Sequence, residues 1–432
     1  SQGTADRLYS LLVEEEDARV CKDIPAESCT RVPGNFFKIS ASQTLTKLSD
    51  EISSAKTVLP WVLGAVGAPP ALIGFLVPIR ESGSLLPQLF IAAGVRRRPL
   101  RKPVWVLGAV LQAFALAGIG IATLTLRGLV AGAAVIGLLA AFSLARGLVS
   151  VASKDVIGKT VPKTRRGRLT GFTTALSGVL TLLMGLLLTV RSSGDPTTGP
   201  LVMLLGSAAV LWVLAGAIFS TVEEVPGATD GGKNAIREAL ARLDLLRTDR
   251  PFRSFVGVRA LLISTGLAAP YYVALAREGS GGMGLLGSFV LASGLAAALA
   301  SGFWGRFSDR SSRRVLIAGA TMAASLGLMV FLLDMLGLLS RYPWIAPLAF
   351  FCLSIAHSGV RVGRKTYLLD MAGGNRRTDY VAVSNSVIGA VLLLGSAVGF
   401  LVPLIGPSGV LLVLSLMGFA GALWGTALPE AQ

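Results

Sequence analysis

The sequence predicts an all-α membrane protein with twelve transmembrane helices in two pseudo-symmetric six-helix bundles. Of its 432 residues, 53% are hydrophobic and only 15% are charged, which is too little charge to cover the surface of a soluble protein of this length. Apolar runs such as 104–126 and 410–428 reach or approach the roughly 20 residues that an α-helix needs to cross a bilayer. Glycine is abundant, with 51 residues, as expected where helices must approach closely inside lipid.

Twelve segments are expected as transmembrane helices. In chain order they are about 35–63, 69–93, 103–126, 129–153, 169–190, 199–222, 254–276, 280–304, 315–338, 344–363, 379–404 and 407–428. Basic residues test this assignment, because Lys and Arg concentrate in cytoplasmic loops. Of the 40 Lys and Arg residues, 29 lie in the N-terminal region and in the loops after spans 2, 4, 6, 8 and 10, whereas only 4 lie in the alternate loops. This alternation predicts that both termini are cytoplasmic.

The predicted topology divides the chain into five parts. They are a cytosolic N-terminal region (1–34), an N-terminal six-helix bundle (35–222), a cytoplasmic linker (223–253), a C-terminal six-helix bundle (254–428) and a tail (429–432). The basic amphipathic stretch 233–246 is expected as a helix that either lies on the membrane surface or serves as a solvated linker. Low Lys beside high Arg, Ala and Gly is typical of a GC-rich bacterium and favours its inner (plasma) membrane as the location.

The two bundles are related by an internal repeat at an offset of 211 residues. Without gaps, the basic loop 94–102 aligns with 305–313, and Lys154 aligns with Lys365. Chance matches between Ala- and Gly-rich helices are common, but matched cations in loops are not. Two six-helix halves related by a parallel repeat are typical of one class of secondary transporters.

The loop 305–314 resembles the signature loop of the major facilitator superfamily. It reads Gly-Arg-Phe-Ser-Asp-Arg-Ser-Ser-Arg-Arg, and the family pattern runs roughly Gly-x-Leu-x-Asp-Arg-x-Gly-Arg-Arg. Phe307 therefore replaces the usual Leu, and Ser312 replaces the usual Gly. The equivalent loop 94–102 keeps the glycine and the cations but has no acidic residue. The resemblance implies a twelve-helix secondary transporter, a symporter or antiporter, that works by alternating access.

The resemblance also implies a gating role for this loop, carried by Asp309, Arg310 and Arg313. A carboxylate at a helix end can accept hydrogen bonds from the N-terminus of a neighbouring helix, where the helix dipole favours an anion. In the family this contact holds the cytoplasmic side closed. By pseudo-symmetry, Asp309 is expected to face the start of the fifth span, near 167–171. Alternatively, the arginines of the loop only anchor the topology.

Ionisable side chains inside the predicted spans are candidate site residues, because charge at membrane depth is costly and usually functional. The deep cations are Lys47, Lys56, Arg80, Arg146, Arg259 and Arg361, and the deep carboxylates are Asp50, Glu51 and Glu81. Guanidinium groups bind carboxylates and phosphates in a bidentate manner, through two hydrogen bonds. This surplus of cations therefore predicts an anionic or zwitterionic small-molecule substrate. The predicted substrate-binding residues are Arg80, Arg146, Arg259, Arg361, Gln88 and Tyr271. Alternatively, all of the deep cations are held in structural ion pairs.

Proton-coupled transport requires a side chain that changes its charge between the two sides of the membrane. The candidates are Asp50, Glu51, Glu81 and His357. We favour Asp50 or Glu51, which share one face of the first span with Lys47. An unperturbed imidazole titrates near neutrality, which makes His357 the third candidate, although a lone histidine in a span is equally expected to be a plain hydrogen-bonding residue.

Other classes of protein have little support in the sequence. The stretch 153–160 has the tail of a nucleotide-binding P-loop, but Ser153 stands where glycine is required and the segment ends a membrane helix. The sequence has neither a catalytic triad nor a metal-binding spacing of Cys and His, so we expect no enzyme, cofactor or metal. Cys21, Cys29 and Cys352 are expected to be reduced thiols. The net charge of +16 follows from the cytoplasmic loops and does not indicate nucleic-acid binding.

Two alternative functions stay open. One is an exporter or flippase of amphipathic drugs or lipids, which predicts a wide apolar cavity that opens towards lipid. The other is a non-transporting membrane sensor or partner-binding protein, in which the N-terminal region and the linker contact other proteins. For the transporter we expect a monomer whose partners are the substrate, the lipid bilayer and the proton.

Overall fold

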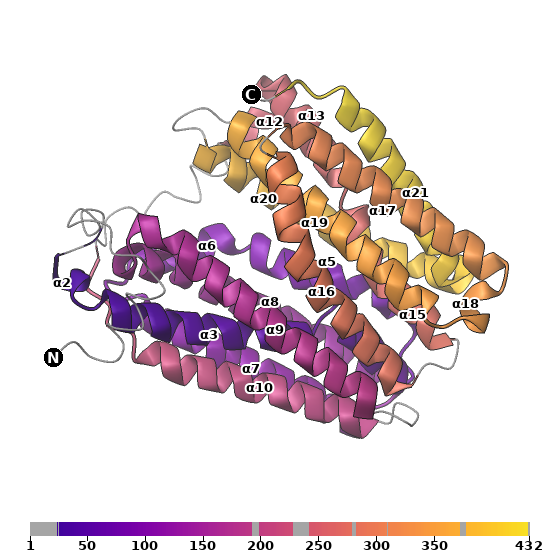
Figure 1. Ribbon diagram of the computed structural model, residues 1–432, viewed down its shortest axis with the longest axis horizontal. Helices are drawn as coiled ribbons and strands as arrows, with labels where there is room; N and C mark the ends of the chain where they lie inside the picture. The colour runs from indigo at the N-terminus through magenta and orange to yellow at the C-terminus, as the bar shows by residue number, and fades with distance from the viewer. Residues whose placement is uncertain are drawn as a thin grey trace.

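The computed structural model describes residues 24, 26–191, 198–227, 242–278, 282–308, 310–371 and 377–430. Throughout these residues the regular structure is helical, as the sequence predicts (Figure 1). Nine helical segments in the described part of the chain are long and apolar enough to cross a membrane. The protein is therefore a multi-pass membrane protein built from α-helices.

In the first half of the chain, four predicted spans are continuous helices and two are interrupted. The continuous ones are α7 (Lys102–Thr125), α8 (Gly128–Thr160), α9 (Lys163–Arg191) and α10 (Thr198–Ser220). The interrupted ones are α3 (Val32–Ile52) with α4 (Val58–Ala65), and η1 (Pro70–Leu72) with α5 (Ile73–Leu85) and α6 (Gln88–Arg96). A short helix, α2 (Ala26–Cys29), precedes them.

The second half repeats this pattern with different interruptions. Its long helices are α16 (Met283–Ser308), α17 (Ser312–Met335), α19 (Ile345–Met371) and α21 (Val402–Thr426). Its seventh predicted span is divided into α13 (Arg250–Leu261), α14 (Ser264–Leu267) and α15 (Ala269–Glu278), and α20 (Arg377–Gly395) reaches α21 through η4 (Ser396–Leu401). The short elements are η2 (Arg242–Asp244), α12 (Leu245–Thr248) and α18 (Leu338–Arg341).

The local sequence explains where the helices are interrupted. Between α3 and α4, the Ser54 hydroxyl accepts a hydrogen bond from the backbone N–H of Lys56 at 3.2 Å, which competes with the helical pattern. Pro87 lies at the N-cap of α6 and has no N–H to continue α5. Gly406 takes a positive φ of 70° immediately before Pro407, a conformation that glycine adopts without steric cost.

The same helix pairings recur in both halves. α7 packs against α8 and α10, and the equivalent α17 packs against α19 and α21. Between the halves, α9 packs against α16 and α5 packs against α20. Because the offset of 211 residues relates the members of each equivalent pair, the packing follows the repeat in the sequence.

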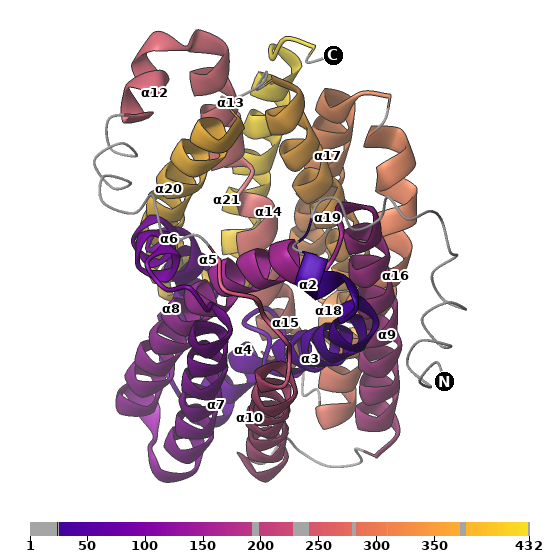
Figure 2. The same cartoon turned by 90° about the vertical axis from the view of Figure 1, so that its left-hand side faces the viewer.

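The two halves approach each other most closely at one end. A Cβ on Gly185 of α9 would meet the backbone of α16, and a Cβ on Gly287 of α16 would meet the backbone of α9. Gly74 of α5 and Gly399 of η4 are in equally close contact. All four glycines lie towards the helix ends that are predicted to face away from the cytoplasm. In Figure 1 the halves converge at the right and separate towards the left, where α2 lies, and Figure 2 looks at them from that left side.

Two predictions fall at least partly outside the described residues, and one is wrong. Asp309 and most of the predicted amphipathic helix 233–246 are not described, and the linker after residue 241 forms η2 and α12.

Cys29 is disulfide-bonded, which contradicts the expectation of reduced thiols, whereas Cys352 is a free cysteine. The spacing of the cysteines matched no metal or redox motif, so the sequence carried no signal for this bond. Cys21 lies outside the described residues.

Gly185→Ala is expected to lower the thermal stability of the protein, because the added Cβ would overlap the backbone of α16. Overpacking of this kind costs about 1–3 kcal/mol. Gly178→Ala on the same helix is the matched control, since a Cβ there meets no atom within 4 Å, and alanine is otherwise favoured over helical glycine by about 1 kcal/mol. Thermal unfolding of both variants in detergent measures the difference. Equal stability would contradict the tight contact between α9 and α16.

Candidate functional site

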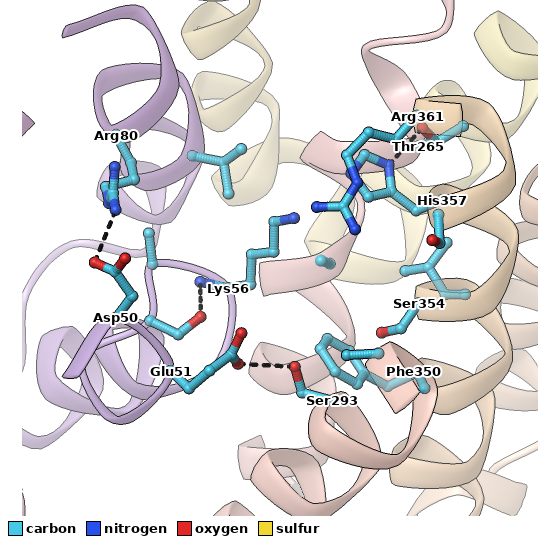
Figure 3. Close-up of a pocket in the computed structure, with 18 of the residues that line it drawn as sticks. Asp50, Glu51, Lys56, Arg80, Thr265, Ser293, Phe350, Ser354, His357 and Arg361 are labelled. Atoms are coloured by element: carbon cyan, nitrogen blue, oxygen red, sulfur yellow. Dashed lines mark hydrogen bonds and ion pairs between the residues drawn. The ribbon is translucent and has the colours of Figure 1, made fainter. Parts of the chain in front are cut away.

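A cavity of about 300 Å³ lies between the two halves of the chain (Figure 3). One side is formed by α3, α5 and the connection between α3 and α4, and the other side by α14, α15, α16 and α19. The ionisable residues that line it are Asp50, Glu51, Lys56, Arg80, Glu81, His357 and Arg361. All of these except Lys56 are predicted from the sequence as substrate-binding or proton-coupling residues, Lys56 is named there only as a deep cation, and the structure brings them together around one cavity.

The end of α3 positions the acidic side of the cavity. Asp50 and Glu51 occupy the last turn of α3, and Lys56 lies in the non-helical connection that follows. Successive residues of a helix point about 100° apart, so these adjacent carboxylates reach different partners. Arg80 and Glu81 face them from α5. The first half therefore supplies all the carboxylates of the cavity, and the second half supplies Arg361 and the imidazole.

Asp50 is held between two arginines from two other helices. Arg80 Nη2 lies 3.1 Å from Oδ1 of Asp50, and Arg146 Nη1 lies 2.5 Å from Oδ2. Each guanidinium also lies over an aromatic ring, Arg80 at 5.0 Å from the centroid of Phe142 and Arg146 at 5.5 Å from that of Trp212. Both carboxylate oxygens of Asp50 are therefore used, and the three charged groups join α3, α5 and α8.

Of the remaining charged groups of the cavity, only some have a direct hydrogen-bonding partner. Glu51 reaches the other half of the chain, because Ser293 Oγ donates a hydrogen bond to Glu51 Oε2 at 3.0 Å. Glu81 and Arg361 are exposed to the cavity. The charged ends of Glu81, Arg361 and Lys56 make no hydrogen bond or ion pair within the described part of the chain. Lys56 interacts electrostatically with Glu81, Arg361 and Glu51 at longer range.

The imidazole of His357 has a fixed orientation. Its Nδ1 lies 3.0 Å from Oγ1 of Thr265, and the same hydroxyl donates to the carbonyl oxygen of Leu262 at 2.9 Å. A hydroxyl carries one proton, so Nδ1 of His357 must donate to Thr265. In the neutral imidazole, Nε2 is then left as a hydrogen-bond acceptor.

Several predicted substrate-binding residues lie away from the cavity. Arg259 is buried and donates to Ser384 Oγ at 2.6 Å and to Asn385 Oδ1 at 2.9 Å, so it joins α13 to α20. Tyr271 is only 2% exposed and does not line the cavity. Gln88 begins α6 beyond the cavity. Position in the sequence could not give the partners of these residues.

Of the predicted gating residues, Arg310 precedes α17 and Arg313 lies in its first turn. Arg313 donates to Glu430 Oε1 and to the carbonyl oxygen of Leu428, each at 2.6 Å, and so ties α17 to the C-terminal segment of its own half. Arg310 is exposed, and Asp309 lies outside the described residues. A gating role for this loop stays a prediction.

The first half has an equivalent contact that uses an acid from outside the loop. Glu224, which follows α10, accepts hydrogen bonds from the backbone N–H groups of Arg101 and Lys102 at 2.9 and 2.7 Å. These N–H groups begin α7, where unpaired donors and the helix dipole favour a carboxylate. Lys159 of α8 forms an ion pair with the same carboxylate. In each half, an acidic residue after the last helix thus anchors the third helix.

Sequence reasoning named Lys56 as a deep cation but did not assign a substrate-binding or coupling role to Lys56, Ser293 or Thr265. Regular helical periodicity places Lys56 off the face that carries Asp50 and Glu51, and only the interruption after Ile52 directs it into the cavity. The two hydroxyl residues carry no distinguishing signal, because serine and threonine are common at contacts between membrane helices.

No protein-family model and no curated protein sequence matches the chain, but solved structures do. The inward-open xylose transporter XylE from E. coli is 16% identical with a TM-score of 0.67, over 92% of this chain and 97% of that one. The nucleoside transporter NupG is 11% identical with a TM-score of 0.72, over 91% and 99%. A POT family transporter in complex with 5-aminolevulinic acid is 11% identical with a TM-score of 0.68, over 94% and 98%.

These similarities extend over nearly the whole length of each protein, although the sequences have diverged. One of the matching structures is described as a major facilitator superfamily proton:xylose symporter, and it covers 93% of this chain with a TM-score of 0.58. The chain has the fold of the major facilitator superfamily transporters.

Proposed function

We propose that the protein is a secondary active transporter that carries a small anionic or zwitterionic molecule, coupled to protons, by alternating access. The observation that carries the proposal is the charged cavity between the two halves, where the exposed guanidinium of Arg361 faces the carboxylates of the first half. Ligand sites of secondary transporters lie near the middle of the membrane at the boundary between repeats. The lining of the cavity from both halves supports this assignment.

The charges of the cavity support a substrate with a carboxylate or phosphate group. Arg146 is bonded to Asp50, Arg259 lies outside the cavity, and Lys47 donates to Thr174 at 2.6 Å. The surplus of deep cations is therefore largely used within the protein. Arg361 lines the cavity without an ion pair in the described part of the chain, so it is the group best placed to bind a substrate anion.

Glu51 is the carboxylate best suited to carry the coupling proton. Asp50 is bonded through both oxygens to arginines. Glu81 lies in the electrostatic field of Lys56, Arg80, Arg361 and Arg364, and these cations oppose its protonation. The direct partner of Glu51 is the neutral hydroxyl of Ser293. We therefore place Glu51 ahead of Asp50 and Glu81 as the coupling residue.

The exporter or flippase alternative has less support. It requires an apolar cavity that opens to lipid, whereas the cavity between the halves is charged. An apolar groove of about 560 Å³ does exist on α6, α7 and α8, where Phe114 and Leu144 are exposed. It shares no lining residue with the charged cavity.

Purified protein reconstituted in liposomes is expected to accumulate an organic acid or amino acid when a pH gradient is imposed. A difference of about one pH unit stores about 1.4 kcal/mol per proton, which supports roughly tenfold accumulation.

Arg361→Ala is expected to weaken substrate binding by about 2 kcal/mol, roughly thirtyfold, while Arg361→Lys retains part of the affinity. Uptake of radiolabelled solutes measures both effects. Absence of flux for every solute would exclude a transporter and leave the sensor alternative.

Glu51→Gln is expected to separate transport from the proton gradient. Without a titratable group at this position, substrate exchange across the membrane continues, but the pH gradient no longer drives accumulation. The amide oxygen can still accept the hydrogen bond from Ser293. Glu81→Gln is the matched control, because it neutralises the other cavity carboxylate that, among the described residues, forms no ion pair with an arginine. Loss of accumulation in Glu81→Gln but not in Glu51→Gln would identify Glu81 as the coupling residue instead.

We further propose twelve membrane spans with both termini in the cytoplasm of a bacterial cell. Arg98→Cys and Tyr342→Cys place exposed thiols in loops that this topology assigns to opposite sides. A membrane-impermeant maleimide added to spheroplasts is expected to label Tyr342→Cys and to label Arg98→Cys only after lysis. Equal labelling of both variants in unlysed spheroplasts would contradict the topology.

A further inference from the structure

Lys56 and Arg361 face each other from opposite halves of the chain. Figure 3 shows both side chains extending into the cavity towards one another. Lys56 comes from the non-helical connection after α3, and Arg361 comes from α19. Among the described residues, neither charged group has an ion pair, and the two interact electrostatically. Two cations thus meet at the boundary that must rearrange during alternating access.

The neighbouring cations differ from this pair because they already have partners. Arg80 and Arg146 share the carboxylate of Asp50, and Lys47 donates to hydroxyl groups of α9. Each of these three cations thus already has a direct partner within the protein. Lys56 and Arg361 are therefore the cavity cations whose charges are not balanced by a direct bond in the described part of the chain.

Two like charges at membrane depth repel each other, and few water molecules are present there to screen them. Glu81 lies in the field of both cations but forms an ion pair with neither. An anion that contacts Lys56 and Arg361 together would remove the repulsion and gain two charge-assisted hydrogen bonds. The arrangement is therefore suited to an anion placed between the two halves.

We propose that Lys56 and Arg361 form a two-sided binding site for one oxyanion group of the substrate, a carboxylate or a phosphate. This inference rests on the proposed transport function and specifies it. Arg361 offers a planar pair of donors that matches two oxygens, and Lys56 offers a point charge on a flexible stem. Because the two residues belong to different halves, the bound oxyanion links the halves and makes their relative position depend on the substrate.

The test is the thermal stability of the purified full-length protein in the presence of acetate, inorganic phosphate or chloride at equal ionic strength. Acetate and phosphate separate a carboxylate site from a phosphate site, and chloride controls for general screening. The variants are Lys56→Met, Arg361→Met and Lys56→Arg. Lys47→Met is the matched control, since Lys47 is a deep cation of the same span that does not line the cavity.

At least one oxyanion is expected to stabilise the natural protein more than chloride does. Lys56→Met and Arg361→Met should each need at least ten times more oxyanion to reach the same rise in unfolding temperature. Lys56→Arg and Lys47→Met should respond at the same concentrations as the natural protein.

Two outcomes would overturn the proposal: an oxyanion response that survives in Lys56→Met, or no response to either oxyanion in the natural protein. Measurement of proton-driven flux in liposomes distinguishes failure of the two-sided site from failure of the proposed transport function. Flux of a solute without sensitivity to Lys56→Met would leave the transporter standing without the two-sided site. Oxyanion binding through both residues without any flux would leave the site standing in a protein that does not transport.

Discussion

The carboxylate of Asp50, bonded at once to Arg80 and Arg146, is the interaction on which the arrangement of the cavity depends. It joins three helices of the first half through two ion pairs. Removal of one partner from such a group leaves a buried charge without compensation. The triad therefore fixes one side of the cavity and leaves the binding of substrate to other residues.

The second constraint is the interruption of the helices that line the cavity. A continuous first span would carry Lys56 away from the face of Asp50 and Glu51, but the break after α3 turns it into the cavity. The cavity can then present carboxylates from a rigid helix end and an ammonium group from a segment without regular hydrogen bonds. Irregular backbone at membrane depth is tolerated where it lines a cavity.

The distribution of charge between the halves connects the site to movement. The first half carries the carboxylates and Lys56, and the second half carries Arg361 and the imidazole of His357. Close glycine contacts, such as that of Gly185 with α16, hold the halves together at one end. A substrate that binds groups from both halves can shift the equilibrium between conformations only through a difference in its affinity for them.

The sequence by itself determined the helical class, the repeat and the signature-like loop, because hydropathy and loop charge are local properties of the chain. It also indicated most of the ionisable residues of the cavity. Only the tertiary structure decided that Arg146 belongs to Asp50, that Arg259 joins two helices outside the cavity, and that Lys56 faces Arg361. The physical reason is that a charge acts through the groups nearest to it, and those groups come from other helices whose position and rotation no single segment encodes.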